Sequence, residues 1–527
     1  MRTLLFPGRH ILHTLFQEQY LLGRLPGRFD RVVFAITSAN HSHSRYNPIA
    51  LHDRAVGVDR FARRLKERVR FEHRVVPIPH FNPTERYATF LLKELREASD
   101  GELELTPRDA VVLSSTPGLN RLFRALGFDV LPGELESLEP ERYAAATPVE
   151  VLKRFAAAGT DWEKDDALCA LLAPSTLELW RDFPDLPRRI LRLFRDPLLT
   201  DHGGLTEMRN YSVYAAGMNE RAALALKYED IRHAVRPGKV VDEGCADGAL
   251  LVPLARDFPD SDLVGIEITG EFVARCLERQ RAMEFGGTYV HFHQRNITEP
   301  VFEPGSIDTT ICNSTTHELW SYGRQEETLR AYLREKFRQT RRRGRIVIRD
   351  VVGPRDKERE VYLWCNDADG SDDDAGDVAA TSTAARFRRF ARDFLADLRV
   401  AGRRGAETAL RYREETVGGR RYFVLRLRDA VEFMLKKDYA ANWRSEMNEE
   451  FAFWDFGQWK RELGDAGFVV LEDASDRGKH SRAYRNEWIV KNRFEGKVEL
   501  YTRGEGGTLG RMDYPVTNMV LVGERRE

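Results

Sequence analysis

A glycine-containing loop between an apolar strand and a helix is the feature that most constrains the fold of this chain. The predicted strand Lys239–Asp242 runs into the segment 242–248, Asp-Glu-Gly-Cys-Ala-Asp-Gly, and a helix is predicted over 250–258. Gly244 and Gly248 let backbone amides approach a ligand closely, and the start of a helix favours an anionic group. The segment predicts a parallel α/β sheet with a ligand-binding loop at its carboxyl edge.

Further strands and helices repeat this pattern up to residue 350. Strands are predicted at 262–267, 289–294, 307–312 and 345–350. Glu267 closes the first of these, where an acidic side chain can accept hydrogen bonds from both hydroxyls of a ribose. The loop, the acidic strand end and the later strands together predict a nucleotide-type cofactor.

These segments resemble the class I S-adenosylmethionine-dependent methyltransferases, over about 210–352 and 455–527. The residues 305–313 look like the family's fourth strand, 343–350 like its fifth, and 459–470 like its last helix and sixth strand. The resemblance implies S-adenosyl-L-methionine as the cofactor. It implies cofactor contacts from Asp242, Gly244, Cys245, Ala246, Asp247, Gly248, Glu267, Ile268, Asn296 and Asn313. A dinucleotide oxidoreductase is the alternative, but its usual Gly-x-Gly-x-x-Gly is absent.

The polar segment 313–318, Asn-Ser-Thr-Thr-His-Glu, follows the fourth predicted strand. His317 has an imidazole whose ordinary pKa lies near neutrality, so it can deprotonate an acceptor hydroxyl or imidazole. Glu318 can orient that imidazole or join it in binding a metal. We expect His317 and Glu318 to be catalytic, without a resident metal site; a helix-start histidine bonded to the backbone is the alternative.

The first 155 residues resemble a second family. Phe6–His13, Phe-Pro-Gly-Arg-His-Ile-Leu-His, follows the first predicted strand. It is similar to the Gly-Arg-x-x-x-x-His-x-Gly-His opening of nucleotidyltransferases of the nicotinamide mononucleotide adenylyltransferase type. The segment 36–48 looks like that family's block after the second strand. The resemblance implies nucleotide binding by Gly8, Arg9, His13 and Ser38.

Two positions depart from the second family's pattern. Phe16 stands where its second histidine should be, and Leu152 stands where its catalytic arginine should be. Lys153 and Arg154 are the available substitutes for that arginine. Because these charges stabilise the departing pyrophosphate, we expect a domain that recognises a nucleotide without transferring it. An active nucleotidyltransferase is the alternative.

The length of 527 residues exceeds what a single hydrophobic core supports. We predict an α/β chain with two Rossmann-like parallel-sheet domains, joined by a helical connector, and an inserted lid subdomain in the second. The predicted parts are 1–155, the connector 156–235, the methyltransferase domain 236–353 and 454–527, and the insert 354–453. The insert contains an acidic run, 366–374, which we predict to be a mobile loop.

Charge and composition limit the partners. The net charge is -1, from 82 basic and 83 acidic side chains, so nucleic-acid binding is possible but not indicated. The five scattered cysteines contain no Cys-x-x-Cys pair, and no apolar run is long enough for a membrane span. We expect a cytoplasmic protein that acts on a small or nucleotide-like substrate, with its oligomeric state open.

The leading hypothesis is a methyltransferase that acts on an oxygen or nitrogen acceptor, with a degenerate nucleotidyltransferase domain used for recognition. One alternative is a bifunctional enzyme that both nucleotidylates and methylates a metabolite. Another is a binding protein that senses the cofactor without catalysis. All three need the intact loop at 242–248.

Overall fold

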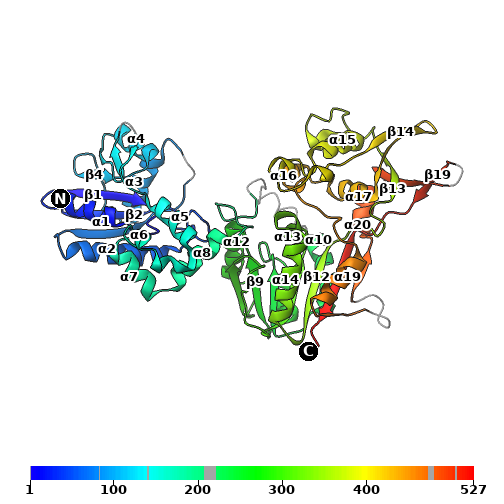
Figure 1. Cartoon of the computed structure of the whole chain (residues 1–527), viewed down its shortest axis with the longest axis horizontal. Helices are drawn as coiled ribbons and strands as arrows, with labels where there is room; N and C mark the ends of the chain where they lie inside the picture. The colour runs from blue at the N-terminus through cyan, green and yellow to red at the C-terminus, as the bar shows by residue number, and fades with distance from the viewer. Residues whose placement is uncertain are drawn as a thin grey trace. The chain divides into compact units, whose positions relative to one another are not determined.

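The computed structural model describes residues 2–81, 84–138, 142–206, 221–472, 480–504 and 507–526. The chain divides into two compact units, Met1–Gly203 and Gly204–Glu527. Each unit is an α/β fold built on parallel strands (Figure 1). None of the helices in these ranges has the length and apolar character that a membrane span requires.

The N-terminal unit contains a five-stranded parallel sheet in the order β3-β2-β1-β4-β5. Its strands are β1 (Thr3–Gly8), β2 (Arg31–Ile36), β3 (Glu72–Pro77), β4 (Ala110–Leu113) and β5 (Asp129–Leu131). The connecting helices are α1 (Leu15–Arg24), α2 (Leu51–Lys66), α3 (Tyr87–Glu97) and α4 (Pro117–Ala125). Near-continuous apolar runs in β1, β2 and β4 fit strands that are covered by helices on both faces.

Further helices complete this unit. They are α5 (Pro148–Ala158), a 3-10 turn (Gly159–Lys164), α6 (Asp166–Cys169), α7 (Pro174–Asp182) and α8 (Asp185–Arg195), after a small hairpin of β6 (Leu135–Ser137) and β7 (Arg142–Tyr143). Phe155, Trp162 and Trp180 form one buried cluster, with the Phe155 and Trp180 rings 4.6 Å apart. The first part of the segment predicted as a connector therefore packs as part of the N-terminal unit, because these large aromatic side chains need burial.

The C-terminal unit contains the second parallel sheet. Its parallel strands, in spatial order, are β10 (Val290–Gln294), β9 (Asp262–Glu267), β8 (Lys239–Glu243), β11 (Ile307–Asn313) and β12 (Thr340–Val351). Three antiparallel strands extend it: β20 (Asn518–Glu524) pairs with β12, and β16 (Val469–Val470) and β17 (Arg482–Tyr484) pair with β20. Its helices are α10 (Arg221–Ile231), α11 (Leu251–Asp257), α12 (Gly270–Arg281), α13 (Thr316–Tyr322), α14 (Glu326–Gln339) and α19 (Phe456–Asp465), with a 3-10 turn (Arg232–Ala234).

An antiparallel sheet and several helices form an insert within the C-terminal unit, drawn in olive to red in Figure 1. Its strands, in spatial order, are β14 (Arg413–Val417), β15 (Arg420–Arg426), β13 (Glu360–Cys365), β18 (Val498–Arg503) and β19 (Leu509–Met512). Its helices are α15 (Thr383–Asp393), α16 (Ala396–Val400), α17 (Leu427–Lys436), α18 (Trp443–Glu446) and α20 (Glu487–Ile489), with short turns at Val378–Ala380, Ala406–Thr408, Ala440–Asn442 and a π-helix at Val490–Phe494. The predicted insert ended at residue 453, whereas β18 and β19 add later residues to its sheet.

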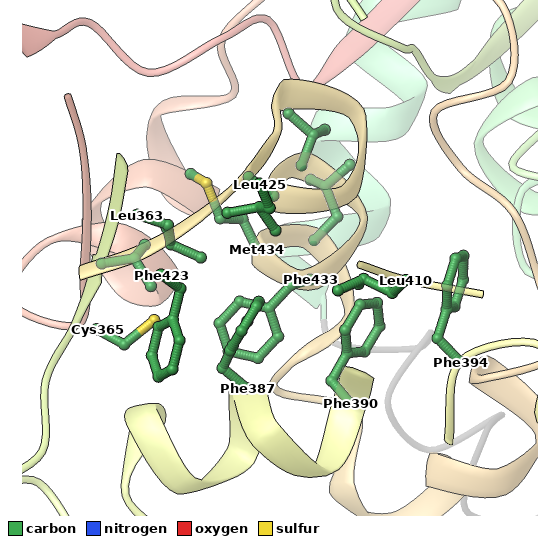
Figure 2. Close-up of a cluster of buried hydrophobic side chains, with 14 of the residues drawn as sticks. Leu363, Cys365, Phe387, Phe390, Phe394, Leu410, Phe423, Leu425, Phe433 and Met434 are labelled. Atoms are coloured by element: carbon green, nitrogen blue, oxygen red, sulfur yellow. The ribbon is translucent and has the colours of Figure 1, made fainter. Parts of the chain in front are cut away.

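The insert has a hydrophobic core of its own. Phe387 and Phe390 on α15 point toward Phe423 on β15 and Phe433 on α17 (Figure 2). The Phe387 ring lies 4.2 Å from the Phe423 ring and 5.1 Å from the Phe433 ring. Burying each such side chain contributes about 1.5–3 kcal/mol, so the insert is held by packing and not only by its attachment to the main sheet.

The acidic run 366–374 has fixed partners. Asp369 accepts hydrogen bonds from the backbone N and the hydroxyl of Thr383, at 2.7 and 2.6 Å, at the start of α15. Asp374 pairs with Arg392 of the same helix at 2.7 Å. The run is a loop, and charge complementarity with a helix later in the chain holds these two carboxylates in place of apolar burial.

Candidate active site

The glycine loop begins at the end of β8. Gly244 and Gly248 have φ angles of +72° and +79°, which favour glycine. A Cβ at Gly244 would also lie 2.5 Å from the hydroxyl oxygen of Thr315. These glycines therefore let the backbone turn sharply beneath the segment that follows β11.

Asp242 is a buried carboxylate without a hydrogen-bond partner among the described residues. It is 2% exposed, lies in β8 next to the loop and makes no hydrogen bond or ion pair with any residue that the structure describes. Burial, together with the nearby Glu243 and Glu267, raises its pKa to about 7 against the opposing effect of Lys227. It lines a small pocket, here called the loop pocket, together with Gly244, Cys245, Ala246, Asp247, Lys227 and Asn313.

Glu267 lies at the end of β9 and also faces the loop. Its two carboxylate oxygens accept hydrogen bonds from the backbone N of Ala246, at 3.0 Å, and of Thr269, at 2.8 Å. Burial raises its pKa to about 7, with Glu318 adding to the effect against the hydrogen bond from Thr269. Each oxygen keeps lone pairs for a further donor such as a ribose hydroxyl. The following residue, Ile268, accepts a hydrogen bond at its carbonyl from Gln294, at 3.1 Å.

Other predicted cofactor residues hold the loop in shape. Asp247 forms an ion pair with Arg279 at 2.6 Å, and Arg279 also donates to the Asp247 carbonyl at 2.9 Å. The Asn296 side-chain oxygen accepts from the backbone N and the hydroxyl of Thr298, both at 2.9 Å. Cys245 is buried beside Cys276. Asn313 ends β11 and contributes to the loop pocket.

These residues fit S-adenosylmethionine. The cofactor offers an ammonium group, a ribose diol and a carboxylate. Asp242 is an open acceptor for a cation, and Glu267 has open acceptor positions for hydroxyls. The predicted ligand set is therefore brought together at the carboxyl ends of β8, β9 and β11, although the lead-in segment 211–219 lies outside the described residues.

A second, wider cavity of about 440 Å³, here called the edge cavity, lies in the same unit. Its walls come from α10, from the carboxyl edge at Ser314, His317 and 349–351, from 438–451 of the insert, and from 486–493. Lys227 lines both the edge cavity and the loop pocket. The side chain of Lys227 is therefore part of the wall of both spaces.

His317 faces the edge cavity between two carboxylates. Its Nδ1 lies 2.8 Å from Asp350 Oδ1, and its Nε2 lies 3.5 Å from Glu449 Oε2. Burial lowers the His317 pKa, but Asp350 and Glu449 outweigh it and raise the pKa to about 9. The Asp350 pKa is lowered by His317 despite burial. The pair is an imidazolium and a carboxylate at neutral pH.

Glu449 reaches the site from the insert. Its backbone carbonyl accepts a hydrogen bond from Lys436, which also forms an ion pair with Glu432 at 2.8 Å. Glu432 accepts from the backbone N of Phe451, at 2.8 Å, and Tyr322 donates to the Glu449 carboxylate at 3.0 Å. The insert thus positions one of the two carboxylates that contact His317.

Glu318 lies on the cofactor side of α13, where its charge raises the pKa of Glu267. In the described ranges, no group of His, Cys, Asp and Glu has the arrangement of a metal site. Sequence reasoning missed Lys227, Asp350 and Glu449. Asp350 could have been found as a strand-end acid, like Glu267, whereas no local pattern marks the other two.

The predicted nucleotide residues of the N-terminal unit lie at the carboxyl ends of β1 and β2. Gly8 ends β1, and Arg9 donates to the Tyr46 carbonyl at 2.9 Å with its guanidinium 5.2 Å from the Tyr46 ring centroid. The Ser38 hydroxyl lies 3.0 Å from His80 Nδ1. His80 stacks on His41 at 4.2 Å.

His13 has a different environment from the one predicted. Its ring is buried, stacks on Phe61 at 4.1 Å and lies 3.3 Å from His10 Nδ1. Burial and His10 lower its pKa well below the usual value, so it is neutral. A buried neutral imidazole is not placed to contact a phosphate, because the Phe61 stack occupies one of its faces.

The two positions that depart from the nucleotidyltransferase pattern, Leu152 and Phe16, also pack against the protein's own residues. Leu152 is buried in the hydrophobic cluster of α5, while Lys153 and Arg154 lie on the exposed face of that helix. Phe16 lines a cavity of only about 10 Å³ beside the ends of β1 and β4, room for about one water molecule. This crevice does not hold a nucleotide in the conformation described.

A comparison with known protein families finds a match within the C-terminal unit. Residues 236–385 match a family of methyltransferase domains. Residues 236–385 of the C-terminal unit thus contain a methyltransferase domain, and the loop in this domain has residues that fit S-adenosylmethionine. No curated protein matches the chain in sequence.

Solved structures of similar fold include three bacterial and archaeal proteins. A SAM-dependent methyltransferase from Methanosarcina mazei is 13% identical, with 56% of this chain and 96% of that chain covered and a TM-score of 0.28. Geranyl diphosphate C-methyltransferase from Streptomyces coelicolor A3(2) is 10% identical, with 60% and 85% covered and a TM-score of 0.29. The YcgJ protein from Bacillus subtilis is 12% identical, with 58% and 100% covered and a TM-score of 0.29. Such low scores carry no functional argument, so the assignment depends on the family match.

Proposed function

We propose that the C-terminal unit methylates an oxygen or nitrogen atom of a small or nucleotide-like molecule that binds in the edge cavity. One observation carries this proposal: the edge cavity, of about 440 Å³, shares the lining residue Lys227 with the loop pocket. A methyl donor in the loop pocket and an acceptor in the edge cavity would therefore face each other. The volume suits a small organic molecule.

The chain's own residues bind and orient the two reactants. Asp242 holds the cofactor's ammonium group and Glu267 its ribose, while the bound cofactor supplies the methyl group. Because in-line transfer needs a positioned nucleophile and exclusion of water, positioning supplies most of the rate. The insert contributes by closing the edge cavity with 438–451, as the lid in this proposal.

The sequence favours His317 as the proton acceptor. In the structure, both of its ring nitrogens face carboxylates, Asp350 and Glu449. We therefore assign His317 a role as an imidazolium that holds Asp350 and Glu449 in place at the wall of the edge cavity. Glu318 adds negative charge near both Glu267 and His317.

A labelling experiment tests the methyltransferase proposal. The full chain is incubated with a cell extract and S-adenosylmethionine that carries an isotopically labelled methyl group, and products are read by mass spectrometry. We expect a labelled small molecule whose yield falls with the Asp242→Asn variant when the cofactor is not saturating. Labelled protein or nucleic acid as the sole product would refute a small-molecule acceptor, and no labelled product would favour a cofactor-sensing role.

For the N-terminal unit, we propose recognition of a nucleotide-like or phosphorylated compound without transfer. Arg9 and the Ser38–His80 pair at the sheet edge support binding of an anion, while the burial of His13 and Leu152 argues against catalysis. The full chain should bind ATP or CTP in calorimetry and release no pyrophosphate from either. Rapid pyrophosphate release would instead support the bifunctional enzyme.

A further inference from the structure

Lys227 of α10 is the residue that the loop pocket and the edge cavity share. It makes no hydrogen bond or ion pair with any residue in the ranges that the structure describes. Asp242 on β8 and Arg349 and Asp350 on β12 are the charged groups close enough to affect it. An amine with no hydrogen bond or ion pair to the described residues thus lines both spaces.

His317 cannot serve as a free base in this arrangement. Asp350 lies 2.8 Å from its Nδ1, and Glu449 lies 3.5 Å from its Nε2. A ring that already carries both protons, held by two carboxylates, has no lone pair with which to accept another. The proton that the acceptor loses needs a different destination.

We propose that Lys227 is the catalytic base, which takes the proton from the acceptor as the methyl group is transferred. This proposal rests on the methyltransferase function proposed for the same two spaces. It adds the residue that receives the proton and a chemical class for the acceptor: a neutral hydroxyl or N–H group, not one that is already ionised.

The step balances in atoms and charge. The acceptor's O–H or N–H bond breaks and its proton binds the lone pair of Lys227 Nζ. The electron pair left on the acceptor forms the bond to the methyl carbon, and the pair of the breaking carbon–sulfur bond stays on sulfur. One positive charge, initially on sulfur, ends on the lysine, so the net charge of the site does not change.

The surroundings of Lys227 suit this role. Burial, together with the Arg349 guanidinium, lowers its pKa to about 8 against the opposing carboxylates of Asp350 and Asp242. Across the edge cavity it faces His317, Glu446 and Glu449. A substantial fraction of the amine is therefore neutral near pH 8, as an efficient base requires.

The test compares two ligands that differ in the sulfur charge and needs no known acceptor. S-adenosylmethionine carries a sulfonium, and S-adenosylhomocysteine a neutral thioether. Protonated Lys227 beside the sulfur should weaken binding of the first ligand alone. Calorimetry on the full chain from about pH 6.5 to 9.5 should show the affinity ratio of the sulfonium to the thioether ligand rising about tenfold, with a midpoint near 8.

Two variants and one control isolate the lysine. Lys227→Met should make the ratio independent of pH across this midpoint, and Lys227→Arg, which stays charged, should hold it at the low-pH value. Lys460→Met, on α19 away from both spaces, should behave as the wild type. Thermal melting checks that each variant is folded, and Lys227→Arg covers the case in which Lys227→Met does not fold.

The outcomes separate the two proposals. If neither ligand binds to the wild type, the methyltransferase proposal fails. If both bind but the ratio is the same in wild type and Lys227→Met at every pH, the role of Lys227 is overturned. In the labelled extract, Lys227→Met should lower methyl incorporation by about 10²- to 10⁴-fold, and an unchanged rate would also overturn it.

Discussion

The carboxyl edges of the two parallel sheets differ in how their polar side chains are satisfied. At the C-terminal edge, Asp242 and Lys227 lack partners among the described residues, and the adjoining edge cavity measures about 440 Å³. At the N-terminal edge, the buried Arg54 donates to the carbonyls of Thr37 and Ser38, both at 2.9 Å, and the crevice measures about 10 Å³. The two sheets have similar strand–loop–helix units. In the C-terminal unit the buried charged groups are open to a ligand, whereas in the N-terminal unit the buried Arg54 bonds the protein's own loops.

This difference has an energetic basis. A buried polar group without a hydrogen bond costs about 1–3 kcal/mol, and more if it is charged. A fold that leaves Asp242 open carries that cost until a ligand supplies the partner. A fold that uses Arg54 to bond its own loops gains stability, but the Arg54 guanidinium is then committed to those loops. The comparison predicts opposite effects of substitution at the two edges.

The largest effect should come from Arg54→Met. This change leaves several loop carbonyls without a donor, so the free energy of unfolding of the N-terminal unit should fall by about 3–5 kcal/mol. S-adenosylmethionine affinity should stay the same, because the cofactor site lies in the other unit. Urea unfolding and calorimetry measure the two quantities, with Arg63→Met on the exposed face of α2 as the control. If Arg54→Met is as stable as the wild type, the proposed difference between the carboxyl edges of the two sheets is wrong.

Asp242→Asn should have the opposite effects: weaker cofactor binding without a loss of stability. Loss of the charge that binds the cofactor's ammonium should weaken S-adenosylmethionine binding by about 1.5–3 kcal/mol, roughly 10- to 100-fold. The folded-state pKa of about 7 lies above the unfolded value, so the wild type loses stability as pH rises from about 4 through 7. The variant should lack that loss and be more stable than the wild type at pH 8. A variant less stable at pH 8 would show that Asp242 has a structural role.

Glu267→Ala should weaken cofactor binding by a smaller amount, about 1–2 kcal/mol, through the loss of hydrogen bonds to the ribose. Calorimetry with S-adenosylmethionine and with methionine separates the contributions, because methionine has no ribose. Only the first ligand should lose affinity. Unchanged affinity for both would refute the assignment of Glu267 to the ribose.

Local sequence patterns predicted the main sheet of the C-terminal unit and its cofactor side. Asp242, Gly244 and Glu267 are marked by their positions at strand ends, and strand ends follow from apolar periodicity. The edge cavity was not predictable in this way. Lys227, Asp350 and Glu449 come together only when α10, β12 and the insert pack, and no spacing in the chain encodes that meeting.

In the N-terminal unit, the sequence predicted a site whose residues the fold does not bring together in the expected way. A motif of histidines and glycines predicted Gly8, Arg9, His13 and Ser38 as one site. Burial then places His13 against Phe61 and leaves Arg9 and Ser38 at the edge. Residue types alone do not tell a ligand histidine from a core histidine, because the difference lies in desolvation by residues far away in the sequence.

The smallest and most specific test uses these two buried histidines, whose pKa values move in opposite directions. His317, between carboxylates, has a raised pKa of about 9, so its contribution to stability is present below about pH 6.5 and is lost as pH rises through 9. His13 has a lowered pKa, so its contribution is lost as pH falls through about 6.5.

Nuclear magnetic resonance of the imidazole protons should therefore show His317 titrating near pH 9 and His13 remaining neutral throughout the native range. Glu449→Gln removes one of the two carboxylates that contact His317, so it should lower the His317 pKa by about 1 and leave His13 unchanged. Glu450→Gln, next in the chain and bonded to Arg404, is the matched control and should change neither. A His317 that titrates near 6.5 in the wild type would return it to the role of base and remove the reason for assigning the proton to Lys227.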